Sequence, residues 1–490
     1  MFKKQIEFSK LGLIICNKDT GFFNQQNTLR TSLDRLFQQF WIYNKKELYL
    51  VGGCVRDLIL GKEPKDYDLC TNATPDEVKK ICDSLDLDYF DSGLKHGTIT
   101  IMDTFFHKNY EITTYRIDGK YTDNRRPDSV TFTPSLEEDL KRRDFTINSM
   151  AYDLLKKELV MLDKSCMDDL NMGVIRTVGN PKDRFSEDGL RMLRAIRFAA
   201  QLGFTIEPKT YQAIKDCAPL INLISKERIR DELSKILMSD NPQALEFIVN
   251  TGLENNDMWG CKTYIGDMVN CEHQNPYHYT DVFHHTMDVI KRLPKNLDIR
   301  WAGLFHDIGK PVVKKLKPGT TDHYRYIGHP EESARIADEI MDILKFPNNN
   351  KEYIHKVVLY HDYPLSTCSM KKFKEKLAEI GVPNFEGFIK LREADALAHK
   401  LSVSTSFAID AIQIVKDRFM KVRNNHEPIS IHDLAINGDD IVSDGFLQGE
   451  EIGECLRWML GIVLEHPEYN TKEKLLEYLQ TFKEMSFQNS

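Results

Sequence analysis

The sequence predicts an α+β protein, in which a small domain with a mixed sheet comes first and helical regions follow. Two observations support this prediction. Residues 45–160 contain short runs rich in Thr, Ile and Tyr between turn-forming residues, and such runs are typical of strands. After about residue 187 the apolar residues recur at helical spacing, and the strand signals fade. At 490 residues the chain has room for about three domains.

The first predicted strand ends at a pair of glycines. Residues 48–51 form an apolar run, and Gly52 and Gly53 follow directly. We expect a turn here, because glycine adopts backbone angles that other residues avoid. Residues 54–60 are then predicted to form a helix that ends at Gly61.

Further strands and helices are predicted downstream. Residues 98–102 and 110–115 are predicted strands, since Thr, Ile and Tyr favour extended structure. Residues 187–202 place apolar side chains on one helix face, and helical patterns continue through 221–253. Residues 262–282 are polar and are predicted to be a linker. A second helical block and a mixed C-terminal segment follow.

Composition excludes several classes of protein. Lys and Arg number 66 and Asp and Glu 74, a net charge of −8, which excludes a uniformly basic surface but allows a local basic channel for nucleic acid. The ten cysteines form no Cys-x-x-Cys pair, so neither a zinc ribbon nor a disulfide scaffold is expected. Reduced thiols favour a cytoplasmic location. No apolar run approaches the roughly 18 residues of a membrane span, and we expect no targeting segment.

Two carboxylates follow the glycine turn at a spacing that favours metal binding. Asp66 and Asp68 are two residues apart, so on a strand both side chains lie on the same face. They repel each other unless a cation lies between them, and Mg²⁺ prefers such oxygen ligands. Glu111 supplies a third carboxylate, to bind a second ion or to activate a hydroxyl group. Beside a glycine turn that can approach a phosphate, these residues predict the catalytic site of a phosphoryl transfer.

Longer motifs surround these residues. They are Thr114–Gly119, Arg125–Asp128, Ser135–Leu140, Arg142–Asn148 and Arg184–Ala195. With the glycine pair and the Asp pair, they resemble the bacterial class II tRNA nucleotidyltransferases, the CCA-adding enzymes, in the superfamily that includes DNA polymerase β. The resemblance covers roughly residues 45–255 and continues more loosely to about 400. It implies a polymerase β-like head followed by all-α neck, body, HD and tail regions.

The resemblance and the patterns together predict five regions. They are an N-terminal extension (1–30), a nucleotidyltransferase head (31–170), a helical neck and body with the base-recognition helix (171–270), an HD domain (271–400) and a helical tail (401–490). Residues 117–130 are rich in Gly, Asp, Asn, Arg and Pro and predict a mobile loop. The resemblance implies that this loop is needed to switch from CTP to ATP, which argues against an enzyme that adds only two cytidines.

Asp188 and Arg191 are predicted neighbours on one helix face, where a plain ion pair is the simpler interpretation. The alternative is base recognition, because cytosine and adenine both offer an amine donor beside a ring-nitrogen acceptor, whereas guanine and uracil offer an oxygen beside a ring N–H. The resemblance assigns this selection of CTP and ATP to these two residues, and assigns ribose and phosphate binding to Arg143, Asp144 and Asn148. The full predicted nucleotide-binding set is Gly52, Gly53, Arg56, Arg143, Asp144, Asn148, Asp188, Arg191 and Arg194.

A second site is predicted around His306 and Asp307. With His285 before them and Asp395 after, they resemble the HD phosphohydrolases, in which His and Asp bind a divalent metal that activates water. Further candidates are His329 and His361, and Asp362 competes with Asp395. The pattern does not identify the substrate. A cyclic phosphodiester, a phosphomonoester and a scaffold role without any substrate are all compatible with it.

The predicted function is template-independent addition of CCA to tRNA 3′ ends from CTP and ATP with Mg²⁺, releasing pyrophosphate. Basic residues of the sheet-to-helix region are expected to contact the tRNA backbone; they are Lys141, Arg142, Arg184, Arg194, Arg197, Lys226, Arg228 and Arg230. Three alternatives stay open: a bacterial poly(A) polymerase with the same head motifs, a protein-modifying uridylyltransferase, which Asp188 and Arg191 disfavour, and a non-catalytic RNA-binding module.

Overall fold

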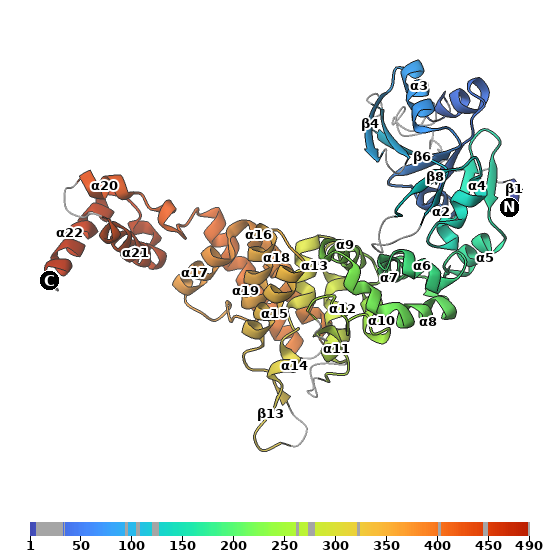
Figure 1. Cartoon of the computed structure of the whole chain (residues 1–490). Coiled ribbons are helices and arrows are strands. Elements are labelled where there is room, and N and C mark those ends of the chain that lie inside the picture. Colours follow the sequence, from blue (N-terminus) through green and yellow to red (C-terminus); the bar gives the residue numbers. More distant parts are fainter. Residues whose placement is uncertain are drawn as a thin grey trace, which may run out of the picture. The chain divides into compact units, whose positions relative to one another are not determined.

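The computed structural model describes most of the chain (Figure 1). The described residues are 1–5, 33, 35–93, 97–103, 108–119, 127–260, 264–272, 280–320, 324–399, 403–443 and 449–488. They divide into two compact units, Met1–Lys262 and Thr263–Ser490. Among the described helices, none has both the length and the apolar character that a membrane crossing requires. Every described cysteine is a free thiol.

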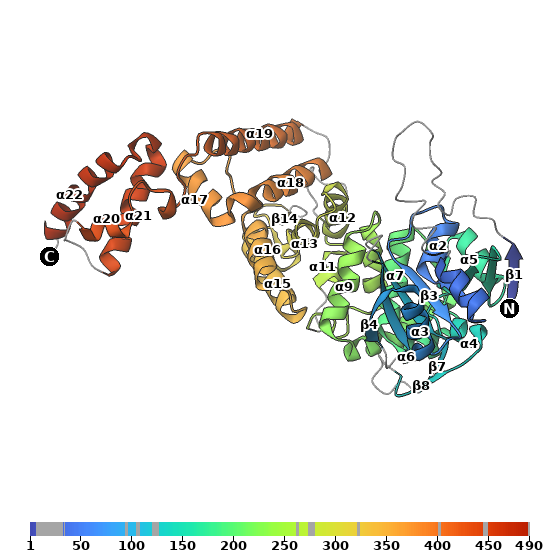
Figure 2. The ribbon, with the colours of Figure 1, turned by 90° about the horizontal axis from the view of Figure 1, so that it is seen from above.

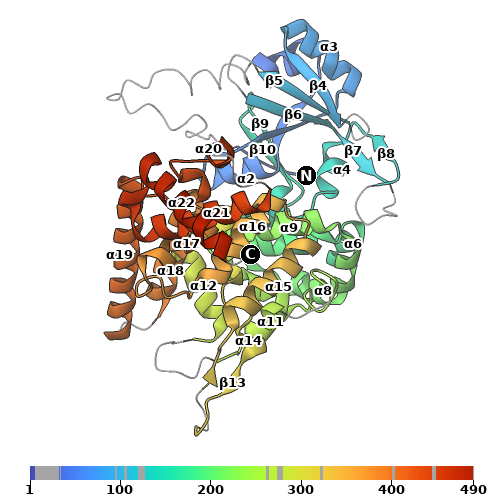
Figure 3. The same cartoon turned by 90° about the vertical axis from the view of Figure 1, so that its left-hand side faces the viewer.

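The first unit is built on a mixed sheet, whose order among the described residues is β1-β10-β9-β2-β3-β6-β5-β4. The strands are β1 Phe2–Gln5, β10 Glu158–Met161, β9 Met150–Asp153, β2 Leu48–Val51, β3 Tyr67–Thr71, β6 Lys108–Thr114, β5 Thr98–Asp103 and β4 Asp88–Gly93. Neighbouring strands are antiparallel except β3 and β6, which are parallel. Figure 3 shows β4, β5 and β6 side by side, with α3 (Pro75–Leu85) next to them.

Helices cover the sheet and continue beyond it. They are η1 Gln39–Tyr43, α2 Gly53–Ile59, α4 Leu136–Lys141, η3 Thr146–Asn148, α5 Ser165–Met172, α6 Pro181–Glu187, α7 Leu190–Leu202, α8 Pro208–Cys217, η4 Ala218–Leu223, α9 Lys226–Leu237, η5 Pro242–Leu245 and α10 Glu246–Asn250. Two short ribbons add β7 Arg116–Asp118 with β8 Val130–Phe132, and β11 Val174–Ile175 with β12 Thr205–Ile206. Helices α7 and α9 pack against each other.

The core of the sheet positions the carboxylates. Cys70 of β3 packs in one apolar cluster with Leu136 and Leu140 of α4. Asp68 is two residues before Cys70, so it lies on the same face of the sheet, at the end of the strand that this cluster leaves open. Arg143 follows directly after α4 and is thereby brought to that face.

The second unit is helical. It contains α11 Tyr264–Met268, α12 Val282–Arg292, α13 Leu297–Phe305, α14 Lys310–Val313, α15 His329–Ile343, α16 Asn348–Tyr360, α17 Met370–Ile380, α18 Val382–Ala398, α19 Val403–Asn424, η6 Ile431–Asp433, α20 Gly438–Ser443, α21 Glu450–Glu465, η7 Pro467–Tyr469 and α22 Lys472–Gln488, with a ribbon of β13 Lys315–Leu316 and β14 Tyr324–Arg325. Helix α12 packs on α18, and α18 on α19; Figure 2 shows the last two side by side. The last helices enclose an apolar cluster of their own.

This architecture confirms the predicted α+β class, with the sheet first and helices after it. The predicted strands 48–51, 98–102 and 110–115 correspond to β2, β5 and β6. The predicted helix 54–60 is α2, which begins one residue earlier.

The single helix predicted over residues 187–202 is wrong. Helix α6 ends at Glu187, Asp188 is extended, and α7 begins at Leu190. The interruption lies at Asp188, whose carboxylate accepts from the backbone N–H of Leu190 and from Arg228 of α9. The adjoining Gly189 has no room for a side chain, because a Cβ there would be 2.9 Å from the backbone oxygen of Leu220. Helical periodicity runs through this break and gives no sign of it.

Three other segments are more ordered than the sequence patterns indicate. Residues 2–5 of the predicted extension form β1, which pairs with β10 through its backbone although its four side chains are exposed. The predicted linker 262–282 contains α11, whose Tyr264, Ile265 and Met268 are buried. The predicted loop 117–130 overlaps the ribbon of β7 and β8 at its ends, and its residues 120–126 lie outside the described part of the chain.

Candidate active site

Two of the three predicted carboxylates lie side by side on neighbouring strands of the sheet, and the third comes just before one of these strands. Asp68 in β3 lies directly beside Glu111 in β6, and Asp66 comes just before β3. Desolvation raises the pKa of Asp68 against the influence of Arg143, and the charge of Asp66 raises it further. Desolvation, followed by the charges of Asp68 and Asp66, also raises the pKa of Glu111. A cation beside Asp68 relieves this repulsion, and carboxylate oxygens are ligands that Mg²⁺ prefers.

Arg143 lies against the glycine turn. Gly52 has a φ of 78°, and a Cβ there would lie 3.1 Å from Nη1 of Arg143, so both the backbone angle and the contact favour glycine. Gly53 is the first residue of α2. Arg143 donates from Nη2 to Oδ2 of Asp139 at 3.1 Å, while its buried Nε has no partner among the described residues. A guanidinium held in place with a spare donor suits a phosphate oxygen.

A chain of hydrogen bonds joins the other predicted nucleotide ligands. Arg56 donates from Nη2 to Oδ1 of Asp57 and from Nη1 to Oδ1 of Asn148, both at 2.7 Å. Oδ1 of Asp144 accepts from Asn148 at 3.2 Å, and Oδ2 accepts from Nε of Arg194 at 2.8 Å. Burial opposes the charge of Asp144, but Arg194 outweighs it and the pKa falls to about 2. The network therefore holds these side chains in place with Asp144 ionised.

Phe198 of α7 supports this network. The guanidinium carbons of Arg56, Arg194 and Arg197 lie 5.1, 5.5 and 4.2 Å from the centre of its ring. The ring also contacts Phe145 edge to face, with a centroid distance of 5.6 Å. These cation–π and aromatic contacts attach α7 to the segment that carries Arg143 and Asp144.

Asp188 and Arg191 each have another ion-pair partner in the structure. Both carboxylate oxygens of Asp188 accept from Arg228, at 2.8 and 3.3 Å, and Oδ1 also accepts from the backbone N–H of Leu190 at 3.0 Å. Arg191 forms an ion pair with Glu187. The simple interpretation, an ion pair between Asp188 and Arg191 on one helix face, is therefore wrong, because the helix begins after Asp188.

The predicted nucleotide ligands nevertheless form one electrostatic group. The charge of Arg191 helps to lower the pKa of Asp144, and the charge of Asp188 helps to raise that of Arg194. Three residues that orient this group were not among the predicted ligands: Asp139, Glu187 and Arg228. Asp139 and Glu187 each lie four residues before the arginine that they bind, which is a local signal. Arg228 comes from α9, and no local pattern relates it to Asp188.

The eight basic residues predicted to contact tRNA all have carboxylate partners. The pairs are Lys141 with Glu137 and Glu138, Arg142 with Asp139, Arg184 with Glu187, Arg194 with Asp144, Arg197 with Glu232, Lys226 with Asp257, Arg228 with Asp188 and Arg230 with Asp231. Residues in such pairs hold the helices in place, and an RNA phosphate has to compete with a carboxylate for each of them. Contact of these residues with tRNA stays a prediction.

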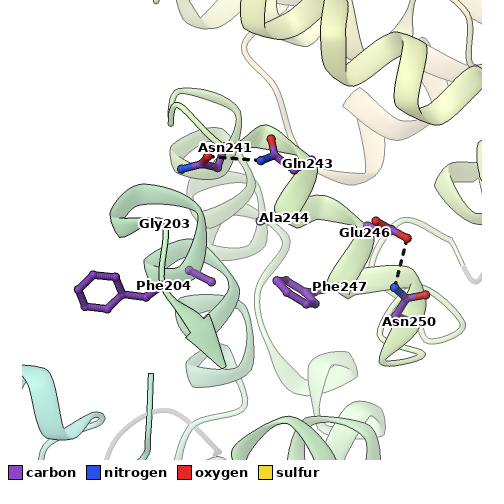
Figure 4. Close-up of a pocket in the computed structure, with 9 residues that line it drawn as sticks. Gly203, Phe204, Asn241, Gln243, Ala244, Glu246, Phe247 and Asn250 are labelled. Carbon is purple, nitrogen blue, oxygen red and sulfur yellow. Dashed lines mark hydrogen bonds between the residues drawn. The ribbon is translucent and has the colours of Figure 1, made fainter. Parts of the chain in front are cut away.

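A small cavity lies beside α7 and α10 (Figure 4). Its lining residues are Ala199, Gly203, Phe204, Asn241, Gln243, Ala244, Glu246, Phe247 and Asn250. Its amides bond within the protein: Asn241 donates to the backbone oxygen of Ala200 at 3.0 Å, Gln243 donates to Asn241 at 3.3 Å, and Asn250 donates to Glu246 at 3.4 Å. None of the predicted site residues lines it.

The second predicted site gathers six side chains in the second unit. They form two groups, each with ligand atoms within 4.8 Å of one another: His285, His306 and Asp395, and Asp307, His329 and His361. Nε2 of His285 lies 2.9 Å from Oδ1 of Asp395. Asp395, and not its competitor Asp362, therefore completes the first group.

Backbone contacts orient the histidines of this cluster. Nδ1 of His306, His329 and His361 each donates to the backbone oxygen three residues earlier, at 2.7, 2.9 and 2.7 Å. The Nε2 lone pairs are then left for a metal ion. Burial, helped by the charges of His306 and His329, lowers the pKa of His361 to about 3, so that this ring is a neutral ligand at pH 7.

The carboxylates of the cluster are held in their ionised form. Burial by itself would raise the pKa of Asp307. The charges of His306 and Lys310 outweigh it and hold this pKa well below its ordinary range. Asp395 has a pKa well below its ordinary range for the same reason, with His285 as the main partner. Ionised carboxylates beside imidazole nitrogens form a donor set that fits a divalent metal ion, and a bound ion takes the place of the proton that the metal-free cluster favours on His306.

Comparison with known proteins agrees with this division into sites. Residues 48–176 match the Poly A polymerase head domain, residues 203–256 match the probable RNA and SrmB-binding site of polymerase A, and residues 282–367 match the HD domain. The nucleotidyltransferase and HD families typically use divalent metals.

Similar proteins are CCA-adding enzymes. The one from Lactobacillus delbrueckii subsp. bulgaricus is 34% identical over 437 residues, which cover 88% of this chain and 93% of that enzyme. The one from Limosilactobacillus reuteri is 48% identical over 209 residues, 42% of this chain and 50% of that enzyme. The structure of the Bacillus stearothermophilus CCA-adding enzyme in complex with CTP matches 94% of this chain and 99% of its own, with a TM-score of 0.69 and 27% identity. The chain thus belongs to the bacterial CCA-adding enzymes, the class II tRNA nucleotidyltransferases, and carries an HD domain.

Proposed function

We propose that this protein adds CCA to the 3′ ends of tRNA, using CTP and ATP and releasing pyrophosphate. The observation that carries the proposal is the group of three carboxylates, Asp66, Asp68 and Glu111, beside the Gly52 turn and Arg143 in a chain of this family. Mg²⁺ bound to Asp66 and Asp68 would lower the pKa of the terminal 3′-hydroxyl and neutralise the leaving phosphates.

The protein's own groups have separate tasks. The guanidinium of Arg143 binds phosphate oxygens of the incoming nucleotide, since its Nη1 lies beside the Gly52 turn and its position is held by Asp139. Glu111 carries a raised pKa and accepts the proton of the attacking hydroxyl group. Asp144 and Asn148 bind the ribose, with Arg194 holding Asp144 in its ionised form.

Base selection is assigned to Asp188 and Arg191. A carboxylate has about four acceptor positions, so Asp188 can accept from the exocyclic amine of cytosine or adenine while Arg228 fixes its orientation. Glu187 holds the guanidinium of Arg191 for the ring nitrogen in the same way. Guanine and uracil leave both groups without complementary partners, which is strongly unfavourable in a desolvated site.

The test uses tRNA transcripts that end before the first C, after one C and after two, each with one nucleotide at a time. We expect CTP to extend the first two by cytidine and ATP to extend the third by one adenosine. Asp188→Ala and Arg191→Ala should add UMP or GMP, whereas Asp68→Asn should add nothing. If the Asp188 and Arg191 variants keep full discrimination, the base-selection proposal is wrong. If Asp68→Asn retains full activity, the assigned catalytic site is wrong.

A poly(A) polymerase is the second candidate, because the match over residues 48–176 is to a head domain of that name. Incubation with CTP as the only nucleotide distinguishes the two activities. A poly(A) polymerase leaves a transcript without CCA unextended, and with ATP it adds a long tail to any 3′ end.

We further propose that the His/Asp cluster binds a divalent metal ion and hydrolyses a phosphoester. The ligands are His285, His306, Asp307 and Asp395, with His329 and His361 as additional ligands. In the reaction a water oxygen bonds to phosphorus, the ester P–O bond breaks, and the alcohol leaves with a proton from the water. Metal content of the purified protein, compared with that of His306→Ala, tests the binding, and hydrolysis of 4-nitrophenyl phosphate tests the activity.

A further inference from the structure

A basic hairpin connects two members of the metal cluster. Between Asp307 and His329 the chain forms α14 and then the ribbon of β13 and β14, which Figure 1 shows projecting beside α14. The backbone oxygen of Tyr326, at the base of the ribbon, accepts from Nδ1 of His329 at 2.9 Å. One end of the hairpin is therefore joined by one hydrogen bond to His329, a candidate metal ligand.

The hairpin carries positive charge that the described residues do not balance. Lys315, Lys317 and Arg325 are exposed and form no ion pair with a described carboxylate. The sequence from 308 to 329 contains one acidic residue, Asp322, which lies outside the described part of the chain, whereas the whole chain has a net charge of −8. In contrast, the basic residues of the first unit considered above are all paired.

The register of the ribbon places like charges against each other. Lys315 is the direct cross-strand partner of Arg325. Like charges directly opposite destabilise a strand pair, so the fold alone does not account for this arrangement. A polyanion bound across the ribbon removes the repulsion, because one phosphate can accept from both side chains.

Aromatic and apolar groups stand between these charges. Nζ of Lys314 lies 4.4 Å from the centre of the Tyr324 ring. Val312, Leu316 and Ile327 expose 58%, 46% and 76% of their surface. Rings and apolar side chains that alternate with free cations are the features by which proteins bind single-stranded nucleic acid, with bases on the rings and phosphates on the cations.

We propose that this hairpin binds single-stranded RNA, with Lys315 and Arg325 on one side of the ribbon and Leu316 and Tyr324 on the other, and that it presents a phosphoester near the RNA end to the His/Asp cluster. The substrate class of that cluster is then a polynucleotide and not a free small phosphate ester. The presentation step rests on the hydrolytic function proposed above, whereas RNA binding by the hairpin does not depend on it.

The binding test uses the full-length protein and K315Q/R325Q, with K291Q/K390Q as control. The control removes two exposed lysines of α12 and α18, so the change in charge is the same. A short single-stranded RNA with 4-thiouridine should crosslink to peptides within residues 312–327 in the wild type and in the control. The double variant should give at least tenfold less of that crosslink at low salt, and the salt dependence of the residual crosslinking to these peptides should fall by about 1.4 in log–log slope, the value for two neutralised phosphate charges.

The hydrolysis test distinguishes a role of the hairpin in binding RNA from a role in positioning the metal cluster. With RNA that ends in a 3′-phosphate, K315Q/R325Q should raise KM about tenfold or more, while hydrolysis of 4-nitrophenyl phosphate changes less than twofold. An equal loss on both substrates shows that the hairpin only positions His329, and overturns the proposal. Because glutamine removes the cross-strand repulsion, the variant hairpin should be at least as protected from hydrogen exchange as the wild type.

Two further outcomes have distinct meanings. If the wild type hydrolyses neither substrate but the crosslink is present and falls in the variant as expected, the hydrolytic function fails and RNA binding by the hairpin stands. If RNA gives no crosslink within 312–327, the proposal is overturned; protection of the same peptides by vesicles of anionic phospholipid would then identify a membrane surface as the ligand.

Discussion

Ionisation of Asp144, which Arg194 and Arg191 favour against burial, should contribute about 2–3 kcal/mol to the stability of the first unit. The pKa of Asp144 falls from 3.8 to about 2 in the folded protein, and each pKa unit corresponds to about 1.4 kcal/mol. Asp144→Asn keeps the shape of the side chain and removes the charge. Arg194 is 31% exposed, so water can solvate it after the change, which keeps the loss near this value. Arg194→Gln leaves the carboxylate buried without its partner and should cost more, about 3–5 kcal/mol.

The pH dependence of this pair has a definite sign. The pKa of Asp144 is depressed on folding, so its stabilisation is complete above about pH 4 and disappears as the pH falls towards 2. Asparagine does not titrate, and the difference between wild type and Asp144→Asn should therefore be roughly halved at pH 3 relative to pH 7. Protonation of other carboxylates affects both proteins equally and cancels in this difference.

Urea unfolding followed by circular dichroism measures the effect, with separate transitions fitted for the two units. Only one transition should shift in Asp144→Asn. Glu137→Gln removes a carboxylate from an exposed pair with Lys141 and serves as the control, for which we expect no measurable change. A loss below about 0.5 kcal/mol at pH 7, or a difference that grows as the pH falls, would refute the account of Asp144.

Three further predictions concern other charged groups. Asp68→Asn should raise the unfolding temperature of the metal-free protein, because it removes like-charge repulsion, and should abolish the rise that Mg²⁺ produces in the wild type; a thermal shift assay with and without Mg²⁺ checks both. Arg228→Gln should lower the selectivity for CTP over UTP about tenfold, because Asp188 loses a charged partner, and unchanged selectivity in single-nucleotide extension contradicts this role. Lys374 is buried and binds Glu427 at 2.8 Å, so Glu427→Gln should destabilise the second unit by about 3 kcal/mol in urea unfolding, and a neutral result would show that the pair is not needed.

Local patterns were sufficient to predict several features. An apolar run followed by two glycines predicted the strand, turn and helix at Gly52. The two-residue spacing made Asp66 and Asp68 candidate ligands. The spacing rule for a strand also relates Asp68 to the buried Cys70, and the structure has this arrangement. The types of residue in the second cluster were equally visible, because His and Asp are the common ligands of a divalent metal ion.

The helix over residues 187–202 marks the limit of such patterns. Periodicity continues through Asp188, but the chain is extended there, and the adjoining Gly189 packs against the backbone of Leu220, a contact between elements distant in the sequence. The partner of Asp188 likewise comes from another helix. The partner of a side chain depends on which elements pack together. The residue pattern within one segment does not predict that packing.

The sequence by itself determined the α+β class, the order of the sheet and the helices, and the types of residue in both candidate sites, since these depend on residue type and short spacing. Only the tertiary structure decided that Glu111 stands beside Asp68 and that Asp395, 110 residues from His285, completes the metal cluster. It also decided that Lys315 lies directly opposite Arg325 in the ribbon. Such pairings arise when separate segments fold against each other, and they depend on the summed packing of the whole unit.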